Sequence, residues 1–363
     1  MNPAEPIVRG GASRLPLPAP RGPVSEALLV LLALDPASTS DVEVAAARLR
    51  DAVDATSALR DPESRLTEDD DVQITLFCLY ELHYRGLEGV SDLWEWEPSL
   101  LAVRATIERA FEAELRRRVE VPQLPSPDRA SVAEALFAMT SADTGPGLSH
   151  YVARKATDEQ LRELVIHRSV YHLKEADPHT WAVPRLGGAP KAALVEIQAD
   201  EYGGGDPALV HAELFAQMMR NLGLDDTYGA YVDSVGAPTL ASMTMMSMFG
   251  LHRRLRGAIV GHLAAFEMTS SIPCKLYGNG FRRHGYDAAT TQYFDEHVEA
   301  DAVHEQIAGR DLAGRLAEDD PAVLADILFG AAACLAVDGW AGDHLVESWQ
   351  RGDGTLRELG AAA

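Results

Sequence analysis

Apolar residues recur at helical spacing along almost the entire chain, and this periodicity constrains the fold more than any other feature. Residues three and four positions apart lie on one face of an α-helix, so each such stretch predicts an amphipathic helix. Alternating apolar and polar residues, the pattern of a half-buried strand, are short and few. The sequence therefore predicts an all-α protein, with helices near residues 25–35, 41–59, 67–86, 98–119, 130–140, 157–175, 190–202, 207–222, 225–234, 238–250, 252–271, 287–309, 319–336 and 340–350.

Proline and glycine divide the chain into three parts. Residues 1–23 are rich in Pro, Gly and Arg and lack the apolar core of a signal peptide, so we expect a disordered leader. The segment VPQLPSPD at 121–128 predicts a boundary between an N-terminal helical accessory region, 24–125, and a C-terminal helical domain, 129–355. The glycine-rich stretches GGAP and GGGD lack both the spacing and the lysine of a phosphate-binding loop.

The charge balance excludes several classes of partner. A formal net charge of -23 argues against nucleic-acid binding, which depends on clustered Lys and Arg. The N-terminal residues 1–23 do not predict a membrane span. The three cysteines, Cys78, Cys274 and Cys334, have no zinc-site spacing and are typical of reduced thiols. We therefore expect a cytoplasmic protein without nucleic-acid or membrane partners.

The segment YFDEHVEADAVHEQ at 293–306 contains the strongest chemical signal. His297, Asp301 and His304 stand at positions i, i+4 and i+7, which places them on one stripe of a helix. Two imidazoles and a carboxylate on one face are ligands typical of a first-row transition metal. The alternative is a solvated acidic face, against which the nearby apolar Phe294 argues.

A second signal is Glu201 and His211, which flank three consecutive glycines, Gly203 to Gly205. Each glycine costs a helix about 1 kcal/mol relative to alanine, so helix stability does not account for them. One interpretation is an unwound turn that lets Glu201 and His211 converge, as interruptions at functional sites often do. The other is a plain interhelical loop that ends where Pro207 starts the next helix.

Two further carboxylates complete the candidate set. Glu267 lies in a largely apolar helix, where a charge needs a metal, an arginine or a raised pKa. Glu175 ends a helix that also holds Glu163, His167 and His172, and the residues alone do not choose among these.

Four carboxylates and three imidazoles exceed what one divalent ion needs and suit two ions bridged by carboxylates. Dinuclear zinc hydrolases use similar ligands, so ligand types alone leave both redox chemistry and hydrolysis open. The paired Glu-x-x-His helices of ferritin-like diiron proteins are absent from the sequence.

The motif Glu201-x9-His211, Glu267, His297-x3-Asp301-x2-His304 resembles the haem-oxygenase-like diiron oxidases and oxygenases, also called iron-containing redox enzymes. The spacing is most similar to the N-oxygenases of that family, the nitrosourea-forming members among them. In that pattern a further Glu precedes the Glu-x9-His pair by about 26 residues, which selects Glu175. The resemblance covers about residues 155–310.

The resemblance implies a seven-helix haem-oxygenase-like bundle that holds two Fe ions (Fe2+/Fe3+) without haem. It implies no catalytic residues beyond the metal ligands, an external reductant as electron donor, and O2 activated through a peroxo-diferric intermediate. The implied substrate is a small amine or amino-acid derivative that is N-oxygenated in a biosynthetic pathway. The alternatives are C–C cleavage or desaturation of an amino acid or fatty acid, and, from another class, a dinuclear metal hydrolase. The N-terminal region resembles the accessory regions of some members, so we expect a homodimer.

Two interpretations concern residues outside the metal set. Arg282 and Arg283 either bind a substrate carboxylate or cap the end of the preceding helix. Glu81 and His83 are interpreted as a hydrogen-bonding patch between the two regions rather than as metal ligands.

Overall fold

The computed structural model describes residues 14–142 and 147–357, apart from the side chains of residues 142 and 299–302. The described residues form helices joined by turns and loops, and no strand forms among them. Their only β-type pairing is an isolated bridge between Leu15 and Leu87. The predicted all-α fold is confirmed.

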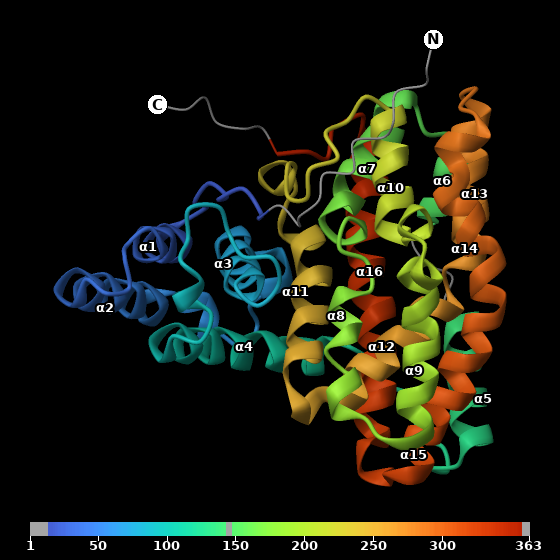
Figure 1. Ribbon diagram of the computed structural model, residues 1–363, viewed down its shortest axis with the longest axis horizontal. Coiled ribbons are helices and arrows are strands. Elements are labelled where there is room, and N and C mark those ends of the chain that lie inside the picture. Colours follow the sequence, from blue (N-terminus) through green and yellow to red (C-terminus); the bar gives the residue numbers. More distant parts are fainter. Residues whose placement is uncertain (1–13, 143–146, 358–363) are drawn as a thin grey trace.

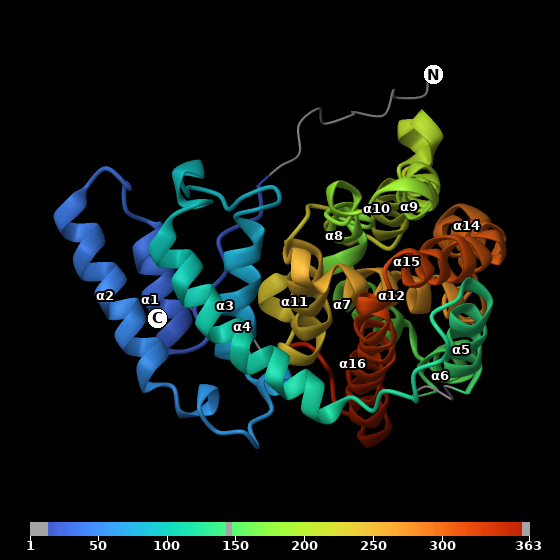
Figure 2. The ribbon, with the colours of Figure 1, turned by 90° about the horizontal axis from the view of Figure 1, so that it is seen from below.

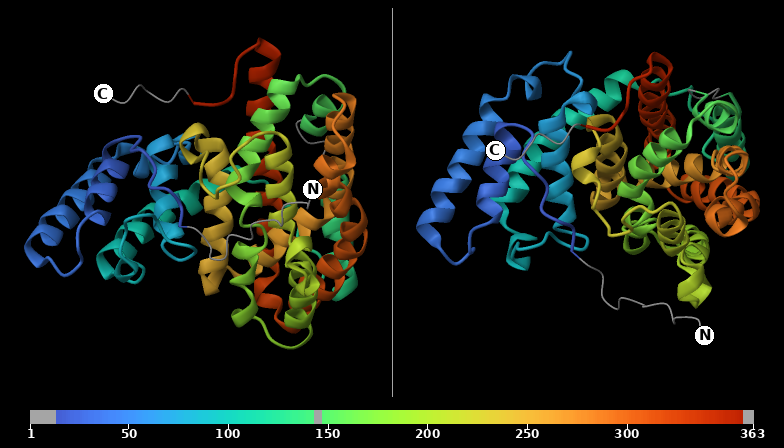
Figure 3. Two further views of the ribbon diagram at one scale, coloured as in Figure 1. Left: turned by 45° about the horizontal axis from the view of Figure 1, so that its top comes forward. Right: turned by 90° about the horizontal axis from the view of Figure 1, so that it is seen from above.

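Four helices from the first part of the chain form a separate group: α1 (Pro23–Leu32), α2 (Thr39–Ala55), α3 (Asp70–Glu81) and α4 (Pro98–Arg118). Figures 1 and 3 show this group standing to one side of the larger bundle. Phe77, Trp94 and Phe111 fill its interior and are at most 1% exposed. Helix α3 packs on α1 and α4 within the group and on α11 of the bundle, so it joins the two parts. The predicted boundary at 121–128 stays a prediction.

The leader is shorter than predicted. Leu15 is fully buried, and Arg21 donates hydrogen bonds to the carbonyl oxygen of Val232 at 2.6 Å and to that of Val235 at 2.9 Å. The expectation of disorder up to residue 23 is therefore wrong for residues 14–22, because an apolar side chain and a guanidinium group find buried partners. Its remaining residues, 1–13, lie outside the described residues.

The rest of the chain builds the bundle shown in Figures 1 and 2. Its helices are α5 (Arg129–Ala142), α6 (Leu148–Arg154), α7 (Asp158–His172), α8 (Asp177–Thr180), α9 (Gly188–Glu201), α10 (His211–Asn221), α11 (Ala237–Leu251), α12 (Arg256–Met268), α13 (Ser271–Arg283), α14 (Ala288–Gln306), α15 (Arg315–Asp319) and α16 (Leu324–Arg351). Between α14 and α15 the chain makes a π-helical segment, Ile307–Gly314.

Helices α12 and α16 pack with their backbones close together. A side chain at Gly261 would overlap the carbonyl group of Ile327, and one at Gly330 would overlap the carbonyl group of Ala258. Glycine is needed at these two positions because the backbones touch. The contact fixes α12, which carries Glu267.

Helix α16 packs along α12 and α11. Together with the turn before it, the segment Pro321–Arg351 is long and apolar enough to cross a membrane by length and composition. However, 61% of its most apolar window is buried inside the protein. A helix that is apolar on all sides is what the core of a helical bundle requires.

The helix boundaries differ from the prediction in several places. Helices α6 and α13 were not predicted. Within α13, Pro273 lies in the first turn, where no amide hydrogen is needed, so it does not interrupt the helix. Residues 225–234 form only a short 3-10 turn, Val232–Ser234. The two predicted final helices are one helix, α16, because its packing on α12 offsets the cost of Gly339, about 1 kcal/mol.

Candidate metal centre

The predicted metal ligands come from five segments of the bundle, and those described converge in its interior. Glu175 follows α7, Glu201 ends α9, His211 begins α10, Glu267 lies near the end of α12, and His297 and His304 lie on α14. All six residues are at most 8% exposed. The seventh predicted ligand, Asp301, lies on α14 with its side chain outside the described residues.

The glycine segment brings Glu201 and His211 together. Helix α9 ends at Glu201, all three glycines from Gly203 to Gly205 have positive φ angles, and α10 begins at His211 rather than at residue 207. A side chain on Gly203 would meet the backbone nitrogen of Val210 at 2.7 Å. The tight turn leaves His211 Nδ1 only 3.0 Å from Glu201 Oε2. The glycines therefore form a tight turn between α9 and α10. This turn brings the side chains of Glu201 and His211 together.

A first group of ligand atoms gathers around Glu175. Glu175, Glu201, His211 and His297 can each offer one atom such that all of these atoms lie within 4.8 Å of one another. Tyr293 donates its hydroxyl hydrogen to the Glu175 carboxylate at 2.8 Å. His297 Nδ1 lies 2.7 Å from the carbonyl oxygen of Tyr293, which only accepts, so Nδ1 carries the hydrogen. In the neutral ring, the lone pair of His297 is then on Nε2, which lies 3.7 Å from Glu175 Oε1.

A second group gathers around Glu267 and meets the same distance limit of 4.8 Å with Glu201 and His304. His304 Nδ1 lies 3.3 Å from Glu267 Oε2. On the other side of the ring, Nε2 lies 3.1 Å from the Asp200 carboxylate, so Nε2 donates and Nδ1 carries the lone pair. This carboxylate–imidazole arrangement is typical of histidines that bind metals.

Glu201 belongs to both groups. A carboxylate has two oxygens and can bind two cations at once. The described residues therefore offer two adjacent clusters of ligand atoms that share one carboxylate, with Asp200 and Tyr293 as outer partners. The π-helical segment begins three residues after His304, and such segments are frequent at functional sites.

The geometry of two imidazoles tests whether the cluster suits a cation. His211 Nδ1 and His297 Nε2 are buried and make no hydrogen bond among the described residues, although carboxylate oxygens lie 3.0 and 3.7 Å away. These two nitrogen atoms lie near carboxylate oxygens without hydrogen-bonding to them. Metal ligands are arranged in this way, because their atoms point at the ion rather than at one another. Imidazole with carboxylate suits iron, zinc or manganese, so the residues fit a pair of such ions.

The pKa values of the site without a metal also indicate that it suits cations. Burial raises the pKa of Glu175, but the imidazoles of His172, His297 and His211 outweigh it and hold that pKa at about 2. Burial lowers the pKa of His297, yet its contact with Glu175 raises it well above the usual value. Without a metal, protons on the imidazoles balance the buried carboxylates. A bound metal ion would displace those protons.

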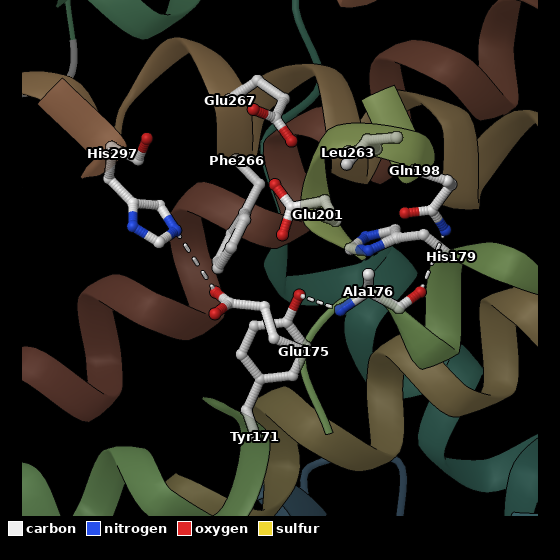
Figure 4. Close-up of a pocket in the computed structure, with 11 residues that line it drawn as sticks. Tyr171, Glu175, Ala176, His179, Gln198, Glu201, Leu263, Phe266, Glu267 and His297 are labelled. Atoms are coloured by element: carbon white, nitrogen blue, oxygen red, sulfur yellow. Dashed lines mark hydrogen bonds and ion pairs between the residues drawn. The ribbon is translucent and has the colours of Figure 1, made fainter. Parts of the chain in front are cut away.

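A small pocket, which we call the central pocket, adjoins both clusters (Figure 4). Tyr171 and Phe266 contribute its aromatic wall, with ring centroids 5.5 Å apart. His179 and Gln198 lie across from His297 in this view, with Glu201 between them. The predicted ligands that line it are Glu175, Glu201, Glu267 and His297.

The turn after Glu175 has an unusual backbone. Ala176 has a φ of 70°, the only positive value among the described residues other than glycine. Such a conformation costs on the order of 1–3 kcal/mol and is held by surrounding contacts. Gln198 Nε2 supplies one of these contacts by donating to the carbonyl oxygen of Ala176 at 3.0 Å.

Sequence reasoning missed several residues around the centre. Tyr293 stands four positions before His297, and Asp200 directly precedes Glu201, so helical spacing offered a signal for Tyr293. His179 and His262 had no signal, because only the fold brings them to 3.1 Å from one another.

Arg282 and Arg283 lie away from the central pocket. Arg282 pairs with Asp295 at 2.5 Å, and Arg283 donates to the carbonyl oxygens of Val152 and Ala153 in α6. Arg283 therefore caps the end of α6 rather than the helix that precedes the arginines, and Arg282 pairs with a carboxylate instead of capping a helix end. Substrate binding by either arginine stays a prediction.

Comparison with known proteins gives one match. Residues 162–339 match the family model described as iron-containing redox enzyme, and all seven predicted ligands fall inside this range. A search of curated proteins gives no match.

Proposed function

Residues 162–339 of this chain belong to the haem-oxygenase-like family of iron-containing redox enzymes, and we propose that it is a non-haem diiron oxygenase. The proposed substrate is a small amine or amino-acid-derived amine, which the enzyme N-oxygenates with O2. Each conversion of an amine to a hydroxylamine consumes one O2, two electrons and two protons and releases one water. An external electron donor supplies the electrons.

The observation that carries the proposal is the sharing of Glu201 between two buried groups of ligand atoms. One iron would be held by Glu175, His211 and His297, the other by Glu267 and His304, with Glu201 between them. Asp301 is proposed as a further ligand because it stands on α14 between His297 and His304. Two adjacent iron ions supply the capacity to bind and reduce O2.

The side chains of this chain prepare the site for that chemistry. Tyr293 orients the Glu175 carboxylate, and the hydrogen bond of His297 Nδ1 fixes the ring so that Nε2 faces the cluster. The walls formed by Tyr171 and Phe266 keep bulk water from the buried carboxylates. The central pocket adjoins Glu201 and marks the side from which a small amine would approach the iron ions.

N-oxygenation is favoured over C–C cleavage by the intervals between the predicted ligands, which are similar to those of the N-oxygenases of the family. We also propose that the enzyme acts in the cytoplasm as a homodimer, with α1–α4 at the dimer interface.

Iron stoichiometry tests the metal assignment. Loading the full chain anaerobically with Fe(II) should give about two iron ions per chain. His211→Ala and Glu267→Ala should each lose about one ion, and Glu201→Ala should lose both. The exposed Glu196→Gln on α9 is the matched control and should keep both. Full iron content in Glu201→Ala would contradict the shared-ligand assignment.

A second assay tests the reaction class. The iron-loaded enzyme with a reductant is incubated with a panel of small amines, and O2 uptake and hydroxylamine formation are measured. We expect substrate-dependent O2 uptake, and no turnover without O2. Turnover of a hydrolysable substrate by the zinc- or manganese-loaded protein without O2 would favour a dinuclear hydrolase instead.

A further inference from the structure

We propose that Tyr286 is a one-electron donor to the iron centre, connected to it by a row of aromatic rings. The row runs from a predicted iron ligand to the surface of the bundle, in the order His297, Tyr293, Phe294, Phe281 and Tyr286. It removes oxidising equivalents from an iron centre that has reacted with O2 while no substrate is bound. The inference rests on the proposed function, because O2 is the oxidant.

The rings of this row follow one another closely. The centroid of the Tyr293 ring lies 4.3 Å from that of His297 and 5.5 Å from that of Phe294. The Phe281 centroid lies 5.6 Å from that of Phe294 and 5.7 Å from that of Tyr286. Separations of this size are those of aromatic rings in contact. Each step is therefore short enough for an electron to tunnel from one ring to the next.

The hairpin of α13 and α14, which lie side by side in Figure 1, builds the row. Phe281 lies near the end of α13, Tyr286 lies in the turn, and Tyr293 and Phe294 lie on α14. The Tyr286 amide nitrogen donates to the carbonyl oxygen of Phe281 at 3.3 Å and closes the turn. The rings of Phe281, Tyr293 and Phe294 are at most 2% exposed, whereas Tyr286 is half-buried. The row therefore reaches solvent at the Tyr286 end.

Tyr286 has a proton acceptor in place. Its hydroxyl group donates to Asp158 Oδ1 at 2.5 Å, while Arg162 Nε donates to Asp158 Oδ2 at 3.0 Å. A phenol that has lost an electron is a far stronger acid than a carboxylic acid. The hydroxyl proton of an oxidised Tyr286 therefore moves to Asp158 along this hydrogen bond, and a neutral phenoxyl group remains.

Electrons and protons balance in both directions. Tyr286 loses one electron, which reduces the O2-oxidised iron centre by one electron, and its hydroxyl proton goes to Asp158. The external reductant of the proposed function then returns one electron to Tyr286, and Asp158 returns the proton. Both side chains are only half-buried, so a reductant in solution can reach this end of the row.

Tyr277 forms a branch of the row and is the poorer donor. Its ring centroid lies 5.8 Å from that of Phe294. However, the guanidinium carbon of Arg168 lies 4.6 Å from the Tyr277 centroid, and Arg168 donates to the Tyr277 hydroxyl oxygen at 3.0 Å. A nearby positive charge disfavours the loss of an electron, and a guanidinium group does not accept the hydroxyl proton. Tyr277 is therefore the matched control for Tyr286.

Electron paramagnetic resonance after mixing with O2 tests the donor. The full chain, loaded anaerobically with Fe(II), is mixed with O2 without amine or reductant and is frozen at a series of times. We expect the signal of a tyrosyl radical, which Tyr286→Phe should abolish and Tyr277→Phe should keep. Ascorbate added after the mixing should remove the signal. A tyrosyl signal that persists in Tyr286→Phe overturns the proposal.

Asp158→Asn tests the proton acceptor. The amide oxygen of asparagine can still accept the hydrogen bond from Tyr286, but an amide does not hold the proton that a carboxylate holds. The variant should keep its iron content and lose most of the tyrosyl signal. An undiminished signal overturns the role given to Asp158.

Phe294→Leu tests the row itself. Leucine keeps an apolar side chain but removes the ring between Tyr293 and Phe281, so the Tyr286 signal should form more slowly and reach a lower yield. Phe249→Leu, at a fully buried position of α11 outside the row, is the matched control and should leave the signal unchanged. Iron content shows whether each variant keeps its ligand cluster. Equal tyrosyl signals in the two variants overturn the path.

Amine turnover separates this inference from the proposed function. A chain that oxygenates an amine with O2 but forms no radical on Tyr286 overturns this inference alone. A chain that forms this radical with O2 but oxygenates no amine overturns the proposed function alone. Bound iron that does not react with O2 overturns both.

Discussion

Lys174 and Glu81 form an ion pair in which neither side chain is exposed to solvent, although one belongs to the bundle and the other to α3. Tyr228 donates to the same carboxylate at 2.9 Å, and the ammonium nitrogen lies 4.0 Å from the centroid of the Tyr84 ring. Lys174 directly precedes Glu175 in the chain. The N-terminal group of helices thus holds the turn that carries a predicted iron ligand.

Removing one charge of this pair should destabilise the protein strongly. Glu81→Gln leaves the Lys174 ammonium group buried without a counter-charge, which typically costs about 3–5 kcal/mol. We expect that loss in the free energy of unfolding measured with urea. We also expect weaker iron binding, because the turn at Glu175 loses its anchor.

A double variant and a surface control sharpen this test. Glu81→Leu combined with Lys174→Met removes both charges and should restore much of the lost stability, because no unpaired charge remains. Glu88→Gln, at an exposed site after α3, should leave stability nearly unchanged. A loss in Glu81→Gln no larger than in Glu88→Gln would show that the pair does not anchor the turn.

Helical spacing was sufficient to predict the fold class and most of the helices, because apolar stripes report which face of each helix is buried. It failed where the local signal was ambiguous. Helix α13 was not predicted although its Pro273 lies in a first turn, and α16 was predicted as two helices although its packing keeps it continuous through Gly339. Residues 14–22 are ordered by contacts with distant segments, which local composition does not report.

The candidate metal centre could be predicted only in part, because contacts between distant segments leave no local signal in the sequence. His297 and His304 lie on one helix, so their spacing pointed to a shared face. Glu175 depended on resemblance, because its position next to His297 arises from the packing of α7 against distant helices. The partnership of His179 with His262 joins residues 83 positions apart and has no sequence signature.

The turn between α9 and α10 should tolerate substitution unevenly. Gly203 has a φ of +75°, and an added Cβ would meet the nitrogen of Val210 at 2.7 Å. Gly203→Ala should therefore destabilise the protein by more than the roughly 1–2 kcal/mol that the left-handed backbone costs an L-residue. It should also lower the iron content, because Glu201 and His211 are pushed apart.

Gly204 is the matched control for this turn. Its φ is +59°, but no atom lies within 4 Å of an added Cβ. Gly204→Ala should show only the backbone cost and keep its iron, as measured by urea unfolding and metal analysis. Equal effects of the two substitutions would mean that the close approach at Gly203 does not set the ligand geometry.

A buried histidine outside the centre should make stability depend on pH. His167 contacts Thr239 Oγ1 at 2.7 Å and Thr355 Oγ1 at 3.0 Å, and burial lowers its pKa to about 3. The unfolded chain takes up this proton near pH 6.5, whereas the folded protein does not, so stability falls as the pH drops from about 6.5 toward 3. Between pH 6.5 and 5 the loss from this residue should be about 2 kcal/mol.

Urea unfolding of the metal-free protein at pH 7 and pH 5 measures this effect. His167→Gln should flatten the difference between the two pH values by about the same 2 kcal/mol. His150→Gln should leave it unchanged, because the His150 side chain is exposed to solvent in the folded protein. An undiminished difference in His167→Gln would assign the acid sensitivity to other groups.

The Asp200 carboxylate should tune metal affinity without binding the metal. It accepts a hydrogen bond from His304 Nε2 at 3.1 Å, while its own side chain is 61% exposed. Asp200→Asn keeps an oxygen that can accept this bond but removes the negative charge that makes the imidazole a stronger ligand. The affinity for one of the two iron ions should fall about 10–100-fold, toward the lower end because solvent screens the exposed carboxylate. Titration with Fe(II) against a competing chelator measures this, with Glu196→Gln as the control, and unchanged affinities in Asp200→Asn would show that Asp200 does not support His304.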